Sequence, residues 1–464
     1  MNFIKVNKLI NRIREAGYEA YVVGGCVRDT LRNVEPHDID VVTSATPEEV
    51  KKVFPDLQTI DTGIKFGTIT VIYDDEQFEV TTYRMEGRYS DSRHPDEVEF
   101  VTDIKDDLSR RDFTINAMAM TIDDESKITE LIDPFNGKAD ICRRLIRCAG
   151  NANERFKEDP LRMLRAIRFA AKLHFNIEDA AYDAICNNAK LLSTVSAERI
   201  TKELKEMIYY DTESLNTLFK TGLLETFLPE LSDCAKQSQK NRWHYADVFH
   251  HTLDAVRYTN KFKKLPKDKL IAVRLALMLH DIGKPACVTT DEEGWEHFYG
   301  HPEVSYKLSL DILHRLKFSN DEIKLISKLV RRHDEVMTPS NKMLLKIISE
   351  YEYDYDDLQL LGYIRESDIM AHIKRENDDR MQRYFKVLKM YRERKESGAI
   401  MTINELAING KDIMNILNIN SGEIIGKIKE DLYQLCFYNP AMNNRDTLTD
   451  FLINHPNRYI NEEE

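Results

Sequence analysis

The first 140 residues alternate between two spacings of apolar residues. Residues 7–16 carry them at helical spacing, whereas residues 20–23 form an apolar run that ends at a Gly-Gly pair and predicts a buried strand. Residues 39–42, 67–72 and 78–83 are further runs rich in β-branched residues, and they also predict strands. Helices between strands predict an α+β head with a mixed or antiparallel sheet.

After about residue 145 the strand pattern ends, and the remaining chain predicts successive helices joined by short polar segments. The polar stretch 234–241 marks a boundary between two helical regions. We therefore expect four parts: a head over 1–140, an all-helical neck and body over 141–235, an all-helical third domain over 236–400, and a helical C-terminal tail over 401–464.

The composition narrows the class of protein. With 42% hydrophobic and 31% charged residues among 464, the chain has enough apolar side chains for packed cores, which excludes disorder as its main state. It has no apolar run of the roughly 18 to 20 residues that a membrane helix needs, and the N-terminus has no apolar signal core. Seven scattered cysteines without a Cys-x-x-Cys pair fit reduced thiols. We expect a cytoplasmic protein with no membrane partner.

The net charge of −13 argues, as an average, against a polyanionic partner. Residues 143–172 reverse this locally, because nine Lys and Arg stand against three acidic residues. This segment predicts a confined, salt-sensitive contact with a phosphate backbone.

A Gly-Gly turn and two aspartates form the first chemical motif. Gly24 and Gly25 end the strand, so backbone N–H groups there can approach a phosphate, and Arg28 lies within reach. Asp38 and Asp40 stand two apart on a predicted strand, so both carboxylates face the same side and suit Mg²⁺. Taken alone, the Gly-Gly pair also fits a plain turn, and the two aspartates also fit surface acids at a strand end.

Residues 24–29 with 38–40 resemble the first motif of class II template-independent nucleotidyltransferases, the CCA-adding enzymes and bacterial poly(A) polymerases. Residues 110–119 resemble the second motif, which implies ribose and nucleotide recognition by Arg110, Arg111, Asp112 and Asn116. The resemblance runs through five motifs over about residues 20–230. Glu79 is a candidate third carboxylate by position only, and a surface ion-pair network is the alternative for the two arginines.

Residues 158–168 place Asp159, Arg162, Arg165 and Arg168 at steps of three on a predicted helix. Asp159 before Pro160 also fits a helix start, with the aspartate as N-cap. An acceptor beside a donor can read the edge that cytosine and adenine share and that uracil and guanine lack. The stretch resembles the family's Glu-Asp-x-x-Arg motif, which implies base selection by Asp159 and Arg162; Arg165 and Arg168 would then contact the triphosphate.

Three other segments complete the resemblance. Residues 133–140 resemble a hinge motif with Gly137 as its pliable point, and residues 198–204 resemble a motif that buttresses the neck. The polar segment 84–95 predicts a flexible loop near the site. Family members that stop after two cytidines have a shorter loop, so its length here favours complete CCA addition.

The third domain carries a histidine–aspartate pattern similar to the HD phosphohydrolase superfamily. His251, His280, Asp281 and Asp368 have the spacing of its metal ligands, which suit Mn²⁺, Ni²⁺, Fe²⁺ or Mg²⁺. A second ion is expected of two further histidines, His301 and His333. Such ligands can persist where activity has been lost, so turnover remains an open question.

Together these patterns predict an enzyme that adds C, C and A to the 3′ end of tRNA from CTP and ATP, with Mg²⁺ in the head. The rivals are a poly(A) polymerase of the same class and a metal phosphohydrolase acting on nucleotide or RNA phosphate ends. Residues 62–71 look more like the CCA-adding branch. A non-catalytic RNA-binding protein is disfavoured because both metal-ligand patterns are complete.

Overall fold

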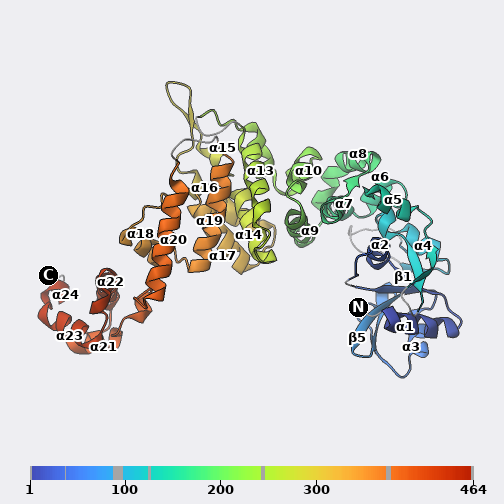
Figure 1. Ribbon diagram of the computed structural model, residues 1–464, viewed down its shortest axis with the longest axis horizontal. Coiled ribbons are helices and arrows are strands. Elements are labelled where there is room, and N and C mark those ends of the chain that lie inside the picture. The colour runs from blue at the N-terminus through green and yellow to red at the C-terminus, as the bar shows by residue number, and fades with distance from the viewer. Residues whose placement is uncertain are drawn as a thin grey trace. The chain divides into compact units, whose positions relative to one another are not determined.

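The computed structural model describes residues 3–36, 38–86, 98–123, 127–241, 246–372 and 378–460. The chain divides into two compact units (Figure 1). Unit 1 comprises residues 1–235 with 312–318, and unit 2 comprises residues 236–311 with 319–464. No helix in the described part of the chain is long and apolar enough to cross a membrane. The division into four parts stays a prediction.

A mixed sheet forms the head, as expected for an α+β fold. Its seven strands run in the order β3-β4-β5-β2-β1-β8-β9. The pairing of β2 with β5 is parallel, and the other pairs are antiparallel. The strands are β1 (Ala20–Val23), β2 (Asp40–Thr43), β3 (Gln58–Ile60), β4 (Thr68–Tyr73), β5 (Glu76–Thr82), β8 (Ala119–Ile122) and β9 (Ile128–Ile132). A separate antiparallel pair consists of β6 (Arg84–Glu86) and β7 (Val98–Phe100).

Both faces of the sheet are covered, which explains why β1 is apolar at every position. One face packs with α1 (Phe3–Glu15) and α3 (Pro47–Val53) around Val22, Val41 and Val80. The other face packs with α4 (Ile104–Ser109) around Val23 and Tyr83. A strand buried on both sides needs a continuous apolar run rather than an alternating one.

The second strand begins later than the sequence pattern predicts. It starts at Asp40, which pairs with Val23, the last residue of β1. Gly24 turns the chain away with φ 74°, so β1 offers no partner for Asp38. Asp38 therefore precedes the strand, and the prediction that both aspartates lie on the strand is wrong for Asp38.

Helices make up the rest of unit 1 apart from one small pairing. The helices are α2 (Gly25–Leu31), α5 (Gly137–Arg143), α6 (Ala152–Glu158), α7 (Leu161–Leu173), α8 (Asp179–Asn188), α9 (Ala197–Tyr210), α10 (Ser214–Lys220), α11 (Leu223–Phe227) and α12 (Pro229–Asp233). Among the described residues, the all-helical expectation fails at a parallel pair of two-residue strands, β10 (Leu145–Ile146) and β11 (Asn176–Ile177), and at an isolated bridge between Cys148 and Phe113. Two residues are too short to show a strand period in sequence.

Unit 2 is built around one helix that is apolar on all sides. Helix α14 (Lys267–Leu279) is buried from Leu270 onward and packs with α13 (Val248–Tyr258), α17 (Asn320–Arg332) and α19 (Tyr355–Met370). The other helices are α15 (Lys284–Cys287), α16 (His301–Arg315), α18 (Asn341–Leu345), α20 (Arg380–Glu396), α21 (Gly410–Leu417), α22 (Glu423–Tyr438), α23 (Arg445–Asn454) and α24 (Asn457–Ile460).

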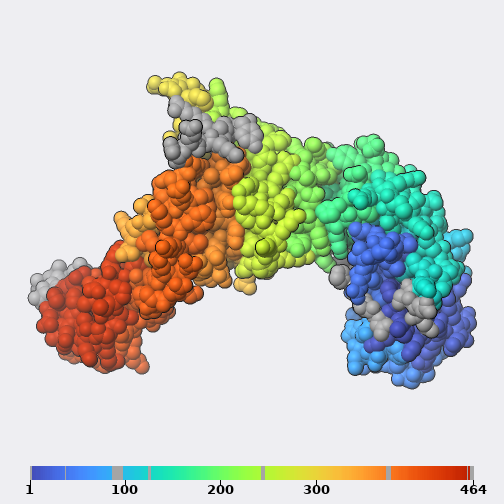
Figure 2. All heavy atoms as spheres, viewed as in Figure 1, coloured from blue at the N-terminus to red at the C-terminus, as the bar shows by residue number. Residues whose placement is uncertain are grey.

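A short hairpin interrupts these helices. Its strands β12 (Thr289–Thr290) and β13 (Glu296–His297) pair antiparallel, which the all-helical expectation missed. The yellow segment that contains it lies at the surface of unit 2 in Figure 2.

Gly137 is tightly packed rather than pliable. It is the first residue of α5, and its backbone N–H donates to Asp133 Oδ1 at 2.6 Å. A Cβ on Gly137 would lie 2.1 Å from the backbone oxygen of Thr114. The glycine therefore allows a close approach of two backbones, a role that the sequence pattern of a hinge did not predict.

A buried ion pair joins the head to α7. Asp112 is 8% exposed, and its Oδ2 accepts from Arg165 Nε at 2.9 Å and Nη2 at 2.6 Å. Its Oδ1 accepts from the backbone N–H of Phe113 and from Asn116 Nδ2. Burial by itself raises the pKa of Asp112, but Arg165 and these donors more than offset it and hold the pKa below its usual range.

We predict that Arg165→Met lowers the free energy of unfolding at pH 7 by about 3 kcal/mol, because it leaves the Asp112 carboxylate buried without its cation. This is the low end for such pairs, since the Arg165 side chain is 34% exposed. In the variant, burial raises the pKa of Asp112, so protonation relieves the deficit as the pH falls. Urea unfolding at pH 7 and pH 5.5 measures both quantities.

The native protein keeps its ion pair over this range, because a lowered pKa loses its stabilising effect only at pH values below the unfolded pKa of about 3.9. Arg143→Met is the matched control, since Arg143 is 68% exposed and 3.9 Å from Asp140, and we expect it to change stability little. An equal deficit at both pH values would contradict the assignment.

Candidate functional site

A cavity of about 870 Å³ in unit 1, here called the head cavity, gathers most of the predicted nucleotide-binding residues. Asp38 and Arg168 are not among its lining residues. Phe169, which the sequence analysis did not connect with the site, also lines it. The predicted residues that do line it are Gly24, Gly25, Arg28, Asp40, Arg110, Arg111, Asp112, Asn116, Asp159, Arg162 and Arg165.

Two carboxylates lie on neighbouring strands in the head cavity. Asp40 pairs with Glu79 in the parallel register of β2 and β5, so both side chains emerge on one face. Desolvation in the cavity raises the pKa of Asp40; Arg111 lowers it and the charge of Asp38 raises it further. Asp38 is exposed, just before the strand. Converging carboxylates whose mutual repulsion raises a pKa are the setting in which a divalent cation binds.

Helix α2 begins at the glycine turn and carries Arg28 into the cavity. A Cβ on Gly24 would lie 3.2 Å from Arg111 Nη1, so the glycine lets the arginine pass close to the turn. Arg28 donates from Nε and Nη2 to Asp29 and from Nη1 to Asn116 Oδ1 at 2.8 Å. Arg28 is thus fixed in orientation by two side chains.

Asp107 holds the two arginines of the second motif, and the sequence analysis missed it. This fully buried carboxylate accepts from Arg110 Nε and Nη2 on Oδ1, and from Arg111 Nη2 at 3.1 Å on Oδ2. Burial by itself raises the pKa of Asp107. The two arginines lower it by more than burial raises it, so the pKa of Asp107 lies below its usual range. The sequence does carry a signal for this contact. Asp107 stands three residues before Arg110 and four before Arg111, a spacing that brings side chains together at a helix end.

Asp159 and Arg162 line the same cavity but bond to other partners. Asp159 Oδ1 accepts from the backbone N–H of Leu161, and Oδ2 accepts from Arg199 Nη2 at 2.9 Å. Arg162 donates to Glu158 Oε2 at 2.7 Å and to the backbone oxygen of Arg110 at 2.9 Å. Helix α7 begins at Leu161 with Pro160 as its N-cap, so the prediction of Asp159 as the N-cap is wrong by one residue, although Asp159 still accepts from a backbone N–H of the first turn.

The basic segment 143–172 directs many of its charges inward. Arg168 donates to Glu203 at 2.5 Å, and Arg147 donates to Asp140 at 2.8 Å. Glu203 belongs to the fifth motif, on α9, so this motif packs against α7 as the neck buttress predicts. The RNA contact expected of this segment stays a prediction, and most of the loop 84–95 lies outside the described residues.

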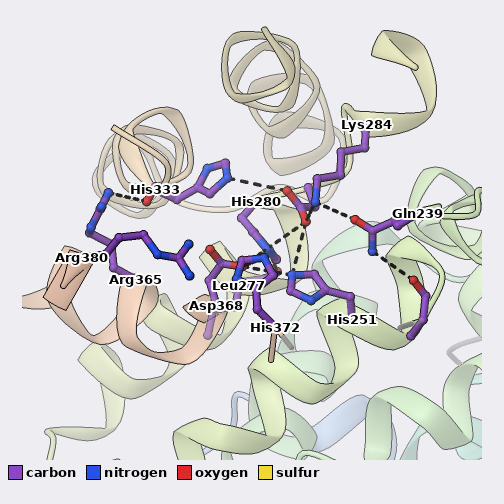
Figure 3. A network of polar contacts seen from close by, with 12 residues as sticks. Gln239, His251, Leu277, His280, Lys284, His333, Arg365, Asp368, His372 and Arg380 are labelled. Carbon is purple, nitrogen blue, oxygen red and sulfur yellow. Dashed lines mark hydrogen bonds and ion pairs between the residues drawn. The ribbon is translucent and has the colours of Figure 1, made fainter. Parts of the chain in front are cut away.

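Unit 2 holds a second site, where histidines and aspartates from separate helices converge (Figure 3). His251 Nε2 lies 3.0 Å from Asp368 Oδ1 and 3.5 Å from Asp281 Oδ2. His280 Nε2 lies 3.2 Å from Asp281 Oδ2. The structure thus brings together the four residues predicted as ligands of the first ion in this domain.

Asp281 lies between two groups of candidate ligands. Its Oδ2 faces His251 and His280, whereas its Oδ1 is 3.2 Å from His301 Nε2 and 3.7 Å from His333 Nε2. Each set of one aspartate and two histidines is close enough to hold one ion. A carboxylate with one oxygen in each set is suited to bridge two ions.

Backbone carbonyls orient three of these imidazoles. The Nδ1 atom of His280 lies 2.6 Å from the backbone oxygen of Leu277. The Nδ1 atom of His301 lies 2.8 Å from the backbone oxygen of Phe298, and that of His333 lies 2.7 Å from the backbone oxygen of Val330. A carbonyl can only accept, so Nδ1 carries a proton in each of these rings, and Nε2 is the ring nitrogen that faces the aspartates and can bind a metal once it is unprotonated. This second set of hydrogen bonds is typical of metal-binding histidines, and the residues fit a divalent ion.

His372 belongs to this site although the sequence analysis omitted it. Its Nε2 lies 3.7 Å from Asp368 Oδ1, and with His251 it forms a third possible ligand group. Burial is the main reason that the pKa of His372 is lowered to about 4. The signal was its position four residues after Asp368, one helical turn away.

The sequence matches three known protein families. It matches the "Poly A polymerase head domain" over residues 20–147, the "Probable RNA and SrmB- binding site of polymerase A" over 174–234, and the "HD domain" over 248–384. The head cavity is formed largely by residues of the first match, and the histidine–aspartate site lies within the third.

Curated relatives are CCA-adding enzymes. The enzyme of Lactobacillus gasseri is 51% identical over 199 residues, which are 43% of this chain and 48% of that protein. The chain thus matches about half the length of this relative. The enzyme of Enterococcus faecalis is 32% identical over 452 residues, which are 97% of this chain and 95% of that protein.

Solved structures show the same fold. The Bacillus stearothermophilus CCA-adding enzyme in complex with CTP aligns with a TM-score of 0.70 and 26% identity over 98% of both chains. The Thermotoga maritima enzyme complexed with tRNA aligns with a TM-score of 0.55 and 20% identity, over 97% of this chain and 94% of that one. Because the chain is 32% identical to the Enterococcus enzyme over nearly the full length of both and shares the fold of the solved structures, it belongs to the family of CCA-adding enzymes.

Proposed function

We propose that the protein adds C, C and A to the 3′ end of tRNA in the cytoplasm, using CTP and ATP and releasing pyrophosphate. The tRNA 3′-hydroxyl attacks the α-phosphate of the bound nucleotide. The observation that carries the proposal is the head cavity, where the Asp40 and Glu79 carboxylates face a set of arginines across a space of nucleotide size.

Asp38 and Asp40 would hold Mg²⁺, with Glu79 as a third carboxylate. When bound, the ion lowers the pKa of the attacking hydroxyl and neutralises charge on the leaving pyrophosphate. Gly25 and Arg28 orient the triphosphate, with Asp29 and Asn116 keeping the Arg28 guanidinium in place. Because the guanidinium is held in place before the nucleotide binds, less entropy is lost when the reacting groups are aligned.

We assign the sugar to Arg111 and Asn116, which Asp107 and Asp112 hold in position. Arg165 and Arg110 supply positive charge on the walls of the cavity. Arg168 points to Glu203 and acts, in this proposal, by fixing α7 to α9 rather than by contacting phosphate.

Base selection falls to Asp159 and Arg162. An acceptor beside a donor matches the amine and ring nitrogen of cytosine or adenine and leaves unpaired groups against uracil or guanine. Both side chains are engaged elsewhere, Asp159 with Arg199 and Arg162 with Glu158. We propose that binding of the base replaces these bonds, at least in part, so that reading the base requires a local exchange of partners.

The activity is tested by incubating the full chain with tRNA that lacks its 3′ tail and with CTP, ATP, or both. We expect two C residues with CTP alone and a complete tail of three residues with both nucleotides. Asp38→Ala with Asp40→Ala should abolish addition, and His280→Ala should leave it intact. Unlimited A addition without CTP would instead support a poly(A) polymerase, and addition that depends on His280 alone would refute the assignment of the head.

We predict that Asp159→Ala lowers the preference for CTP and ATP over UTP and GTP by about 10- to 100-fold, the usual worth of one base-reading pair. Single-nucleotide incorporation kinetics measure this ratio of kcat/KM values. Arg199→Met distinguishes base reading from a merely structural ion pair, because it frees Asp159 and should preserve the preference. Asp183→Ala, an exposed acid on α8, is the neutral control. An unchanged preference in Asp159→Ala would contradict the proposal.

A second candidate function belongs to unit 2. We propose that its histidine–aspartate site binds Mg²⁺ or a divalent transition metal and hydrolyses phosphate esters. The specific observation is that Asp281 offers one oxygen to each of two histidine pairs whose Nε2 atoms all face it. A bound divalent ion would supply an activated water nucleophile at neutral pH.

We predict about two Mn²⁺ ions per chain at this site, measured by equilibrium dialysis in an Asp38→Ala, Asp40→Ala background that removes the head site. Asp281→Ala should remove both ions, because it contributes to both ligand groups. His333→Ala should remove one. Retention of both ions in Asp281→Ala would show that the aspartate is not the bridge, and CCA addition by Asp281→Ala in the otherwise native chain reports that unit 1 is intact.

A further inference from the structure

The histidine–aspartate site opens into a cavity of about 810 Å³ in unit 2, here called the HD cavity, whose outer wall is aromatic. The wall comes from the β12–β13 hairpin and the residues directly after it: Trp295, His297, Phe298 and Tyr299. The metal-site residues Asp281, His301 and Asp368 line the same cavity. Hydrolysis of an ester requires only the polar part, so the aromatic wall needs another explanation.

Tyr299 exposes an unusual amount of ring surface for a residue that lines a cavity. It is 77% exposed, and its ring lies parallel to that of His297, with 5.4 Å between centroids and 7° between planes. His297 therefore supports one face of the tyrosine and leaves the other accessible. A flat, supported and accessible ring is the feature that stacks a planar ligand such as a nucleobase.

Hydrogen bonds hold the hairpin and the His297 ring, on which Tyr299 stacks, in place. Asp291 Oδ1 accepts from the backbone N–H groups of Glu293 and Trp295, at 3.0 and 2.8 Å. Its Oδ2 lies 2.8 Å from His297 Nε2. Glu296 accepts from Ser238 Oγ and from the backbone N–H of Lys240, which ties the hairpin to the body of unit 2. The platform is preorganised, which lowers the entropy lost when a ligand stacks on it.

Lys284 lies between the metal site and the aromatic wall, and a second cation, Arg380, lines the same cavity. Lys284 and Arg380 both line the cavity, and Lys284 Nζ is 5.5 Å from the centroid of the Phe298 ring. Lys284 also lies 2.6 Å from Asp281 Oδ2, so it sits at the edge of the metal site. The cavity thus offers a metal site and cations for a phosphate and a stacking surface for a ring.

We propose that the Tyr299–His297 pair is a base-stacking platform, so that the HD cavity selects phosphate esters carrying a nucleobase over those that lack one. The inference rests on the phosphohydrolase proposed for unit 2, and it adds the residues that determine specificity. Because every base has a π-face, the platform discriminates base from no base rather than one base from another. Tyr299 acts by binding and touches neither the reacting bond nor the metal ligands.

The test compares AMP with ribose 5-phosphate, which has the same sugar and phosphate but no base. Binding is measured by isothermal titration calorimetry on the full chain loaded with Mn²⁺, in the Asp38→Ala, Asp40→Ala background. We expect AMP to bind at least tenfold more tightly than ribose 5-phosphate. Tyr299→Ala should weaken AMP about tenfold or more and leave ribose 5-phosphate unchanged. Tyr299→Phe keeps the ring and should restore AMP binding.

Two controls separate failure of the platform from failure of the proposed hydrolase. Phe385→Ala removes an exposed aromatic side chain elsewhere in unit 2, which is not among the cavity-lining residues, and should change neither affinity. AMP binding that survives in Asp281→Ala would place the ligand outside the HD cavity and overturn the inference. Equal affinity for the two probes, or AMP affinity unchanged by Tyr299→Ala, would also overturn it. If the affinities behave as expected but neither ester is hydrolysed, the platform stands and the hydrolase proposal fails.

Discussion

The buried pair of Asp112 and Arg165 is the interaction on which the arrangement of the head cavity depends. A carboxylate that is 8% exposed needs a cation and hydrogen-bond donors, and those come from different parts of the chain: Arg165 from α7 and Asn116 from the second motif. Asn116 in turn accepts from Arg28 of α2. One desolvated charge therefore sets the relative positions of three segments that line the cavity.

The same principle explains how a strongly acidic protein maintains a basic cavity. Arginines that repel one another are each held by a carboxylate: Arg110 and Arg111 by Asp107, Arg162 by Glu158, and Arg165 by Asp112. These pairs fix the guanidinium groups before any nucleotide binds, so less conformational entropy is lost when it does. Asp159 and Arg162 differ from these fixed pairs, because the proposed base reading requires them to exchange their present partners.

In the site of unit 2, neutral groups rather than charged ones orient the functional side chains. Its imidazoles are oriented by backbone carbonyls rather than by acids, which leaves Asp281 and Asp368 available as ligands. The negative charge of these aspartates also affects the pKa of a neighbouring histidine. Burial lowers the pKa of His280, but Asp281 outweighs it and raises the pKa to about 10. A divalent ion would take the place of that proton, as metal binding to histidine requires.

The sequence by itself determined the α+β head, the helical remainder and the glycine turn, and it singled out many of the residues that the structure gathers in the two sites, although it missed Asp107 and His372. These features depend on local spacing: the period of apolar residues, a glycine with positive φ at the end of β1, and acids or histidines one turn apart. The family resemblance followed from the same motifs. The limits of the four predicted strands were accurate to within a few residues, except that Asp38 fell outside β2, whereas β3, β8 and β9 of the same sheet were not predicted.

Only the tertiary structure decided which charge meets which. Asp112 pairs with Arg165, which is 53 residues away, and Asp159 pairs with Arg199, which is 40 residues away. Spacing along one helix cannot reveal such partners, because they are chosen by how helices pack and by the need to neutralise buried charge. The tight fit of Gly137 against Thr114 and the place of the Tyr299 ring at the HD cavity arise in the same way, from contacts between segments that no local pattern encodes.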